Sequence, residues 1–339
     1  MLLGTALWWP GEGRTFPLLP LFDFLNGTSI YVSWIPATGL FLSCFLYAMG
    51  RLTTRVFLPV VLLCAALSCV LDLNRLQVWV WMWLLLWVVE GLDARRGTRS
   101  GFQMWVLAGL YFWSGLFKMT PWFQTNFDWF CEAFALTKPL SGNVVLPYLT
   151  GAAEALAGLL LLFPATRTVA KWAITGLHVY ILLVLGPLGY HWNQVVWPWN
   201  VAMIGLVWSY FSGNERPRAV PLAGYWAVGL MVWIMPILNK WHWWPESMSW
   251  KMYSNTHREA SIIAPNGNPC PALAPVWPSD RSDLQIADWA IKDLQSPPFN
   301  SIGNFKNALR YVRACGSDTV DLEVLTVGWW DQKEQLERY

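Results

Sequence analysis

The chain of 339 residues is 55% hydrophobic and only 13% charged, and its formal net charge at pH 7 is +2. Soluble domains carry about 25% charged residues, so this composition is typical of a polytopic membrane protein and excludes an ordinary soluble domain. The small net charge, with no basic run in the sequence, argues against a nucleic-acid partner.

Residues 1–28 do not match a cleaved signal peptide, because they lack a basic start and their apolar residues are interrupted by Pro10–Arg14. We interpret them as an interfacial arm in which Trp8 and Trp9 lie at the level of the lipid headgroups. The lipid bilayer is therefore the first partner that the sequence predicts.

Residues 29–239 hold eight apolar segments, of which the second and third are short beside the roughly 20 residues that a bilayer-crossing helix needs. We therefore predict an all-α polytopic membrane bundle of about eight transmembrane helices. The predicted spans are 30–50, 56–71, 76–91, 102–119, 144–163, 168–186, 195–212 and 221–238.

The basic residues between these spans are distributed unevenly. The connections on one side hold nine of them: Arg51, Arg55, Arg95, Arg96, Arg99, Arg167, Lys171, Arg216 and Arg218. The connections on the opposite side hold three: Arg75, Lys118 and Lys138. Because basic loops stay in the cytoplasm, we expect both termini outside, in the periplasm if the membrane is a bacterial inner membrane.

Residues 240–339 are more polar and rich in proline, which indicates a separate periplasmic or lumenal domain. Amphipathic patterns predict helices over 286–294 and 305–314, and alternating patterns predict strands over 320–327 and 260–263. We therefore expect a small C-terminal α+β domain of about 100 residues outside the membrane.

Two cysteines of this domain, Cys270 and Cys315, are candidates for a disulfide because the outer compartment is oxidising. Pairing cannot be read from sequence, so two free thiols are the alternative. The chain has no CxxC pair and no other metal-ligand spacing, so no metal is predicted.

Three ionisable residues fall within or at the end of apolar segments, where a charge is costly and commonly faces a bundle interior. They are Lys118 in GLYFWSGLFKMTPWF, Glu154 in GAAEALAG and His178 in TGLHVYILL. Each has a structural alternative. Lys118 would reach for the outer headgroups, and Glu154 and His178 would be hydrogen-bonded core residues.

Further polar and aromatic residues gather on the predicted outer side. We expect them to form a substrate-binding mouth beside Lys118, with Glu154 and His178 deeper in the bundle. They are Asp72, Arg75, Tyr111, His191, Asn193 and Trp197. For Asp72 and Arg75 the alternative is an ion pair within a turn.

These residue types suit a base-driven reaction on a lipophilic substrate. An amine in apolar surroundings favours its neutral form and can then act as a general base. A histidine or an asparagine can stabilise a developing oxyanion. A mouth fringed by tryptophan fits a flat molecule that arrives from the bilayer, such as a quinone or hydroquinone.

The stretch YFWSGLFKMTPWF, Tyr111–Phe123, resembles the Tyr-Phe and Gly-x-x-Lys pattern of the vitamin K-dependent gamma-carboxylases. Their bacterial relatives form the horizontally transferred transmembrane (HTTM) family. The likeness extends to DLNRLQVWVW, Asp72–Trp81, to AGLLLLFPATRTVAKW, Ala157–Trp172, and to the segment around His178. It covers about Asp72 to Phe211. The bundle is also similar to DoxX/MauE-type redox-associated membrane proteins, some of which are accessory subunits.

The resemblance implies that Lys118 is the base that deprotonates a vitamin K hydroquinone, with His178 supporting the site. In that family a peptide glutamate is then carboxylated on the lumenal side. The present chain departs from the family in its outer domain, because about 100 residues do not resemble the large lumenal domain that binds the substrate propeptide.

Three functions follow from the sequence, and whether the protein is an enzyme is left open. The main prediction is a quinone-linked enzyme with Lys118 as the base and His178 and Glu154 tuning the site. The second is a non-catalytic subunit that anchors a periplasmic redox partner through residues 240–339 and the stretch WHWWPESMSW, Trp241–Trp250. The third is a proton-coupled transporter, ranked last because no inverted repeat is visible.

Overall fold

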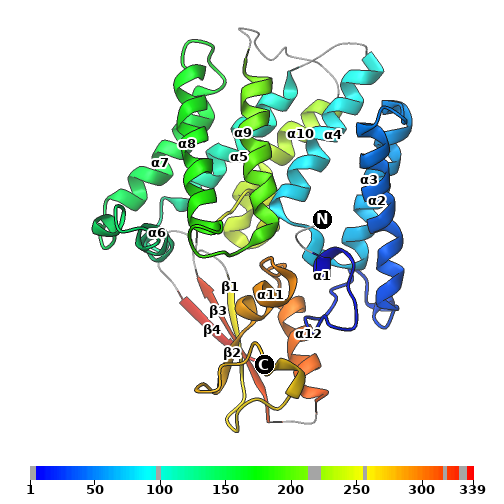
Figure 1. Cartoon of the computed structure of the whole chain (residues 1–339), viewed down its shortest axis with the longest axis vertical. Coiled ribbons are helices and arrows are strands. Elements are labelled where there is room, and N and C mark those ends of the chain that lie inside the picture. Colours follow the sequence, from blue (N-terminus) through cyan, green and yellow to red (C-terminus); the bar gives the residue numbers. More distant parts are fainter. Residues whose placement is uncertain (1–4, 97–100, 213–222, 255–257, 316–318, 328–333) are drawn as a thin grey trace. The chain divides into compact units, whose positions relative to one another are not determined.

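The structure is a computed structural model that describes residues 5–96, 101–212, 223–254, 258–315, 319–327 and 334–339 (Figure 1). These residues form a mostly helical protein with a small C-terminal sheet, as the sequence predicts. Their contacts divide the chain into two compact units. Unit 1 comprises Met1–Gln77, Asn193–Val195 and His257–Tyr339, and unit 2 comprises Val78–Trp192 and Val196–Thr256.

This division differs from the three predicted segments, 1–28, 29–239 and 240–339. The arm and the first two long helices belong to the same unit as the C-terminal domain, and residues 240–256 belong to the helical unit 2. The change in composition at residue 240 therefore does not mark the boundary between the compact units.

Unit 1 begins with the arm and a helical hairpin and ends with the α+β domain. Its helices include α1 (Thr5–Trp8), the 3-10 helix η2 (Ile30–Ser33), α2 (Trp34–Ala48), α3 (Thr54–Leu71), η3 (Leu73–Arg75), α11 (Ile286–Leu294) and α12 (Ile302–Arg313). Its strands are β1 (Arg258–Ile263), β2 (Asp283–Gln285), β3 (Asp321–Val327) and β4 (Glu334–Arg338).

Unit 2 consists of helices and their connections in the residues that the structure describes. Its main elements are α4 (Val78–Arg96), α5 (Phe102–Lys118), α6 (Phe123–Glu132), α7 (Leu146–Leu160), α8 (Arg167–Leu185), α9 (Trp197–Tyr210), α10 (Ala223–Trp233) and the 3-10 helix η6 (Met235–Trp241).

Three helices among the described residues are long and apolar enough to cross a membrane. They are Ile30–Ala48, Thr54–Leu71 and Arg167–Leu185, and at most a third of their apolar windows is buried inside the chain. Such outward-facing apolar helices are what a bilayer would cover. The prediction of eight spans is therefore wrong in its number, although each predicted span contains a helix.

The predicted spans fall short for identifiable reasons. Helix α9 (Trp197–Tyr210) has 14 residues, with Pro198 in its first turn, and α10 has 11, after which the chain continues as a 3-10 helix with Pro236 in its first turn. Helix α7 is apolar but has 15 residues. Helix α5 has 17 residues and is buried along most of its length, so it is the centre of unit 2.

Helices α5 and α7 pack with their backbones in close contact because glycines line the contact. A Cβ atom at Gly158 would lie 2.7 Å from the Ala108 carbonyl oxygen, and one at Gly115 would collide with the Ala155 amide and the Gly151 carbonyl. Small residues at such positions let two apolar helices approach closely. The segment GAAEALAG thus fixes how α7 lies against α5.

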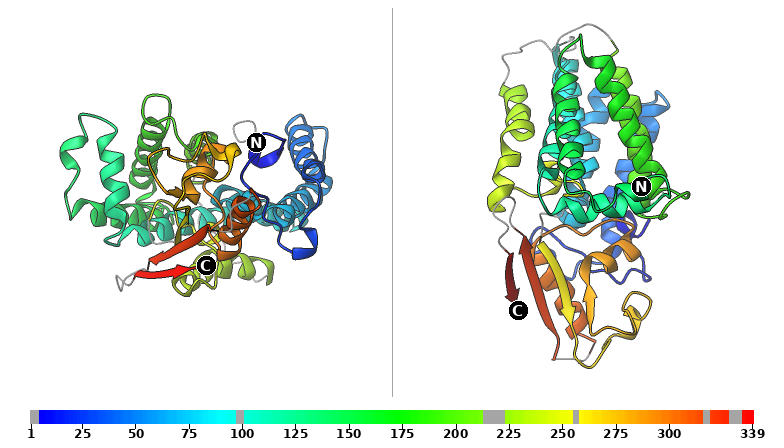
Figure 2. Two further views of the ribbon diagram at one scale, coloured as in Figure 1. Left: turned by 90° about the horizontal axis from the view of Figure 1, so that it is seen from below. Right: turned by 90° about the vertical axis from the view of Figure 1, so that its left-hand side faces the viewer.

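The C-terminal sheet has the order β2-β1-β3-β4, with every neighbouring pair antiparallel. The registers Ala260–Val324 and Ile262–Leu322 place these four side chains on one face, where they are buried. Helices α11 and α12 cover that face (Figure 2). Both predicted helices and both predicted strands are present, whereas β2 and β4 are additional strands.

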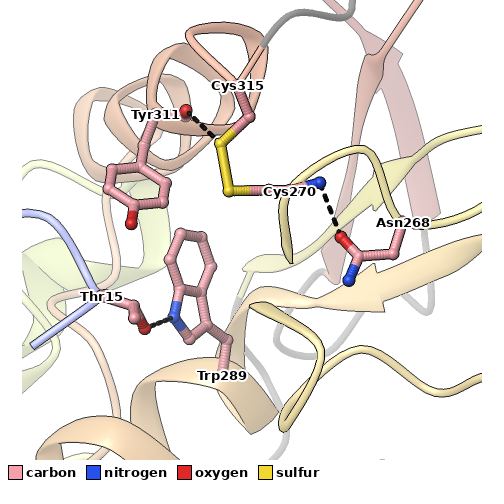
Figure 3. Close-up of a disulfide and its surroundings, with 6 residues drawn as sticks. All are labelled: Thr15, Asn268, Cys270, Trp289, Tyr311 and Cys315. Atoms are coloured by element: carbon pink, nitrogen blue, oxygen red, sulfur yellow. Dashed lines mark hydrogen bonds between the residues drawn. A yellow bond between two sulfur atoms is a disulfide. The ribbon is translucent and has the colours of Figure 1, made fainter. Parts of the chain in front are cut away.

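The structure pairs Cys270 with Cys315 in a disulfide (Figure 3). The two residues are 45 positions apart, so loop closure contributes about 4 kcal/mol in the chain-entropy description. Close to it, the Trp289 indole N–H donates to Thr15 Oγ1 over 2.8 Å, and the Tyr311 ring lies 5.6 Å from Trp289. Unit 1 therefore joins its N-terminal arm to the α+β domain through this cluster.

The glycine contact between α5 and α7 predicts a large difference between two alanine substitutions. Gly115→Ala should lower the free energy of unfolding by at least about 3 kcal/mol, because its methyl group meets backbone atoms that cannot move aside. Gly176→Ala in α8, where a Cβ meets nothing within 4 Å, should be neutral or slightly stabilising. Unfolding by SDS in mixed micelles measures both, and equal effects would contradict the packing described.

Candidate functional site

Lys118 lies at the end of α5 and is buried rather than extended toward the surface. Its Nζ is 2.6 Å from Glu154 Oε2, and it donates a hydrogen bond to Ser114 Oγ over 3.0 Å. The exposed fractions of the lysine and glutamate side chains are 8% and 4%. The structure therefore directs the amine into the helix bundle and toward a carboxyl group.

The local sequence explains this geometry. Ser114 and Lys118 are four residues apart on α5, so their side chains lie on the same helix face. Glu154 stands on α7 between Gly151 and Gly158, at the surface that touches the α5 backbone. Close helix packing thus brings the carboxyl group within reach of the lysine.

A second hydrogen-bonded group lies on α5, α8 and α9. The Tyr111 hydroxyl is 2.8 Å from His178 Nε2, and His178 Nδ1 is 2.6 Å from Asn200 Oδ1. The Asn200 amide nitrogen donates to the Val196 carbonyl over 2.8 Å, so its oxygen must face the histidine and accept. The neutral imidazole then carries its hydrogen on Nδ1, and Nε2 accepts from Tyr111.

Both groups use one face of α5. Tyr111, Ser114 and Lys118 are spaced by three and four residues, which places them on a single helical stripe. Tyr111 and Lys118 are seven residues apart, or roughly 10 Å along the helix axis. The predicted catalytic residues Lys118, Glu154 and His178 therefore line the interior of the same bundle.

The Lys118–Glu154 contact defines what the site can do chemically. An ammonium with a carboxylate and an amine with a carboxylic acid have the same net charge, and they differ in the position of one proton. The pair can therefore take up a proton from a bound acid and hold the resulting anion beside a cation.

The structure corrects the role predicted for Asp72 and Arg75. Arg75 is fully buried in unit 1, where it donates to the carbonyl oxygens of Leu7 and Trp8 over 2.9 Å each and to Ser33 Oγ over 3.0 Å. Burial lowers the pKa of Arg75 to about 10, with the charge of Asp72 opposing the shift. Its guanidinium therefore stays protonated at neutral pH and clamps the arm.

Asp72 belongs to the same clamp and does not line a substrate mouth. Its carboxylate is 2.9 Å from Arg14 NH2 and accepts from the Leu19 amide, so its ion pair is with the arm. Trp8 is 1% exposed, so the arm is packed into unit 1. The prediction that Trp8 lies at the level of the lipid headgroups is therefore wrong. The arm packs there because the buried guanidinium groups of Arg14 and Arg75 need hydrogen-bond acceptors, which the carbonyl groups of the arm supply.

Of the remaining predicted mouth residues, His191 and Asn193 lie in the connection after α8, and Trp197 begins α9. His191 is exposed, and its ring centroid is 5.1 Å from that of Trp197, whose indole N–H donates to the Trp192 carbonyl. Asn193 is buried and has a left-handed backbone, with φ 51°. The hydrogen bonds described for Lys118 lead to Ser114 and Glu154, so they do not join it to this connection.

Asp93 is expected from the sequence to be interfacial, at the cytoplasmic end of a predicted span, but in the structure it is buried in unit 2. It accepts from Gln103 Nε2 over 3.2 Å and from the Tyr225 hydroxyl. Sequence reasoning did not assign Ser114 or Asn200 to the site. Ser114 had a usable signal, because it precedes the lysine by one helical turn. Within the described residues, no cluster of three or more His, Cys, Asp or Glu side chains could hold a metal ion.

No protein-family model, curated protein or solved structure matches this chain. The resemblance to the gamma-carboxylases therefore stays a prediction.

The Lys118–Glu154 pair predicts strong coupling between two substitutions. Lys118→Met alone should cost about 3–5 kcal/mol of unfolding free energy, because it leaves a buried carboxyl group without its partner. Lys118→Met combined with Glu154→Leu should recover most of that loss, as apolar replacements of buried pairs commonly do. A double-mutant cycle by SDS unfolding measures the coupling, and effects that add within about 0.5 kcal/mol would contradict a direct interaction.

The Arg75 clamp predicts a change in protease sensitivity. Arg75→Gln should leave the carbonyls of Leu7 and Trp8 without a charged donor and release the arm, at a cost of about 3 kcal/mol. Trypsin should then cut after Arg14, whose side chain is 3% exposed in the folded protein. Arg281→Gln, at an exposed position of the same unit, is the control and should leave Arg14 protected.

Proposed function

We propose that this chain is an integral membrane protein and that the core formed by α5, α7, α8 and α9 is a quinone-linked enzyme site. The observation that carries the proposal is the buried Lys118–Glu154 pair, with 2.6 Å between Nζ and Oε2. Buried ionisable groups in membrane bundles are costly and are commonly retained for function. The substrate class that we propose is a hydroquinone.

In this proposal the pair acts as the base, instead of the lysine alone. The hydroquinone O–H bond breaks, its proton passes to the Glu154 carboxylate, and the monoanion takes the place of that carboxylate beside the Lys118 ammonium. Net charge is unchanged in the apolar interior, which avoids the cost of creating an isolated charge there. Ser114 accepts from the same amine and holds it in position.

The group of Tyr111, His178 and Asn200 would support the site from the same face of α5. A neutral histidine whose Nε2 accepts from Tyr111 can exchange a proton with the tyrosine hydroxyl. We assign these residues a positioning or proton-relay role. Asp72, Arg75 and the connection with His191 have no part in this proposal.

A second candidate, an anchoring subunit for a periplasmic or membrane partner, is favoured by one surface of unit 2. Trp241 and Trp243 are 52% and 74% exposed, their ring centroids are 6.0 Å apart, and Lys240 lies over the Trp241 ring. Trp250 is fully buried, so part of the predicted patch faces inward. The exposed pair would serve either a protein partner or the lipid headgroup region.

The enzyme proposal predicts hydroquinone deprotonation that depends on the pair. Purified protein in nanodiscs would be titrated anaerobically with a short-chain naphthohydroquinone, and the absorbance of the bound hydroquinone anion would be followed. The wild type should form the anion, whereas Lys118→Met/Glu154→Leu, the variant expected to keep the fold, should lose it at least tenfold.

The matched control is Lys171→Met. Lys171 is also a buried lysine of unit 2, but its Nζ lies 4.4 Å from the centre of the Trp208 ring. This variant should form the anion as the wild type does. Wild-type anion formation by the double variant would overturn the enzyme proposal, and a stoichiometric protein partner lost on Trp241→Ser/Trp243→Ser would favour the second candidate.

A further inference from the structure

Unit 1 contains a cavity that belongs to neither the Lys118 pair nor the His178 group. Its volume is about 430 Å³, which lies within the range of about 300–1,000 Å³ for small-molecule sites. Its walls come from the arm (Gly11, Glu12, residues 14–18 and Pro20), from residues 25–30 and Ser33, from Leu71 at the end of α3, and from Tyr311 of α12.

The walls combine hydrocarbon with neutral polar groups. Leu25, Ile30 and Leu71 supply aliphatic surface, and Thr28 and Ser29 supply hydroxyl groups. An amphipathic ligand fits such a lining, because its chain replaces water on the aliphatic side while its headgroup finds hydrogen-bond partners.

The charges around the cavity disfavour an anionic ligand. The Arg14 guanidinium is already bound by the Asp72 carboxylate at 2.9 Å and by the carbonyl oxygens of Phe16 and Pro17 at 2.7 and 3.2 Å. Glu12, which also lines the cavity, is exposed and acidic. Burial raises the pKa of the Tyr311 phenol, so this wall residue is neutral at physiological pH.

The cavity lies at the ends of two helices that are apolar enough to cross a membrane. Ile30 begins the Ile30–Ala48 helix, and Leu71 ends α3. Next to it, Leu21 donates its amide to the Val70 carbonyl, and the Phe22 and Phe24 rings are stacked and exposed, Phe24 by 81%. An apolar approach from the membrane interface therefore leads to these walls.

We propose that this cavity binds an uncharged amphipathic lipid from the bilayer, with its polar headgroup at Thr28 and Ser29 and its hydrocarbon chain against Leu25, Ile30 and Leu71. This lipid site shares no residue with the proposed quinone-linked site, so the outcome of a test of one does not decide the other. Tyr311 is one turn before Cys315, and the disulfide to Cys270 holds this part of the wall in place (Figure 3).

Two neighbouring glycines provide a matched test. Gly11 lines the cavity, Gly13 does not, and a Cβ atom at either would meet nothing within 4 Å. Gly11→Trp should therefore fill the cavity, whereas Gly13→Trp adds the same side chain outside it. Ser29→Trp, at an exposed position of the wall, is a second filling variant if Gly11→Trp proves unstable.

The probe is a diazirine-bearing monoacylglycerol added to the full-length protein in detergent micelles, with photolabelled residues identified by peptide mass spectrometry. The wild type and Gly13→Trp should label within residues 11–33 or at Tyr311, and a filling variant should lose at least tenfold of that label. Equal labelling of the filling variants, or label spread evenly along α2 and α3, would overturn the proposal. A photoreactive fatty acid that labels as strongly as the monoacylglycerol would refute the uncharged class.

Discussion

A charged side chain that is buried in this protein needs a partner within the chain, and this constraint fixes how several of the described elements pack. Lys118 lies 2.6 Å from Glu154, and Asp93 is held by Gln103 and Tyr225. The free energy of an uncompensated buried charge is large compared with the stability of a whole protein. Helices that carry such groups are therefore fixed in register as well as in contact.

In unit 1 the same constraint acts through one short turn. The Asp72 carboxylate accepts from the Leu19 amide of the arm, and the Arg75 guanidinium donates to the arm carbonyls of Leu7 and Trp8. The buried Asn74 of this turn accepts from the Phe299 amide and from Asn304 of α12 over 2.9 Å each. Four consecutive residues thus tie the N-terminal arm, the end of α3 and the α+β domain together, which explains why contacts place these distant segments in one compact unit.

The sequence was sufficient for some features because their signals are local. Lys118, Glu154 and His178 stand out as ionisable residues in apolar segments, and α11 follows its amphipathic pattern at both ends. The contact between Glu154 and Lys118 is not local, because it depends on which helices are neighbours. The small residues Gly151 and Gly158 are the local indication that α7 packs closely against another helix. Arg75 was misplaced because its partners are mainly backbone carbonyls, which every residue possesses and no sequence pattern marks.

Other failures have equally physical causes. The predicted spans treated the chain around Pro198 and Pro236 as continuous helix, whereas α9 begins at Trp197 with Pro198 in its first turn, and the chain beyond α10 continues as the 3-10 helix η6 with Pro236 in its first turn. Strands β2 and β4 have three and five residues with polar sequences, so their place in the sheet depends on pairing with β1 and β3 instead of on their own composition.

The fixed amide of Asn200 has a consequence for how quickly His178 can respond to a change in its surroundings. Asn200 Oδ1 accepts from the imidazole Nδ1 whether the ring is neutral or protonated, so no heavy atom has to turn when a proton arrives at Nε2. The change requires one rotation, that of the Tyr111 hydroxyl hydrogen away from the ring. The rate at which His178 is protonated at Nε2 should then depend more on replacing hydrogen with deuterium than on the viscosity of the solvent.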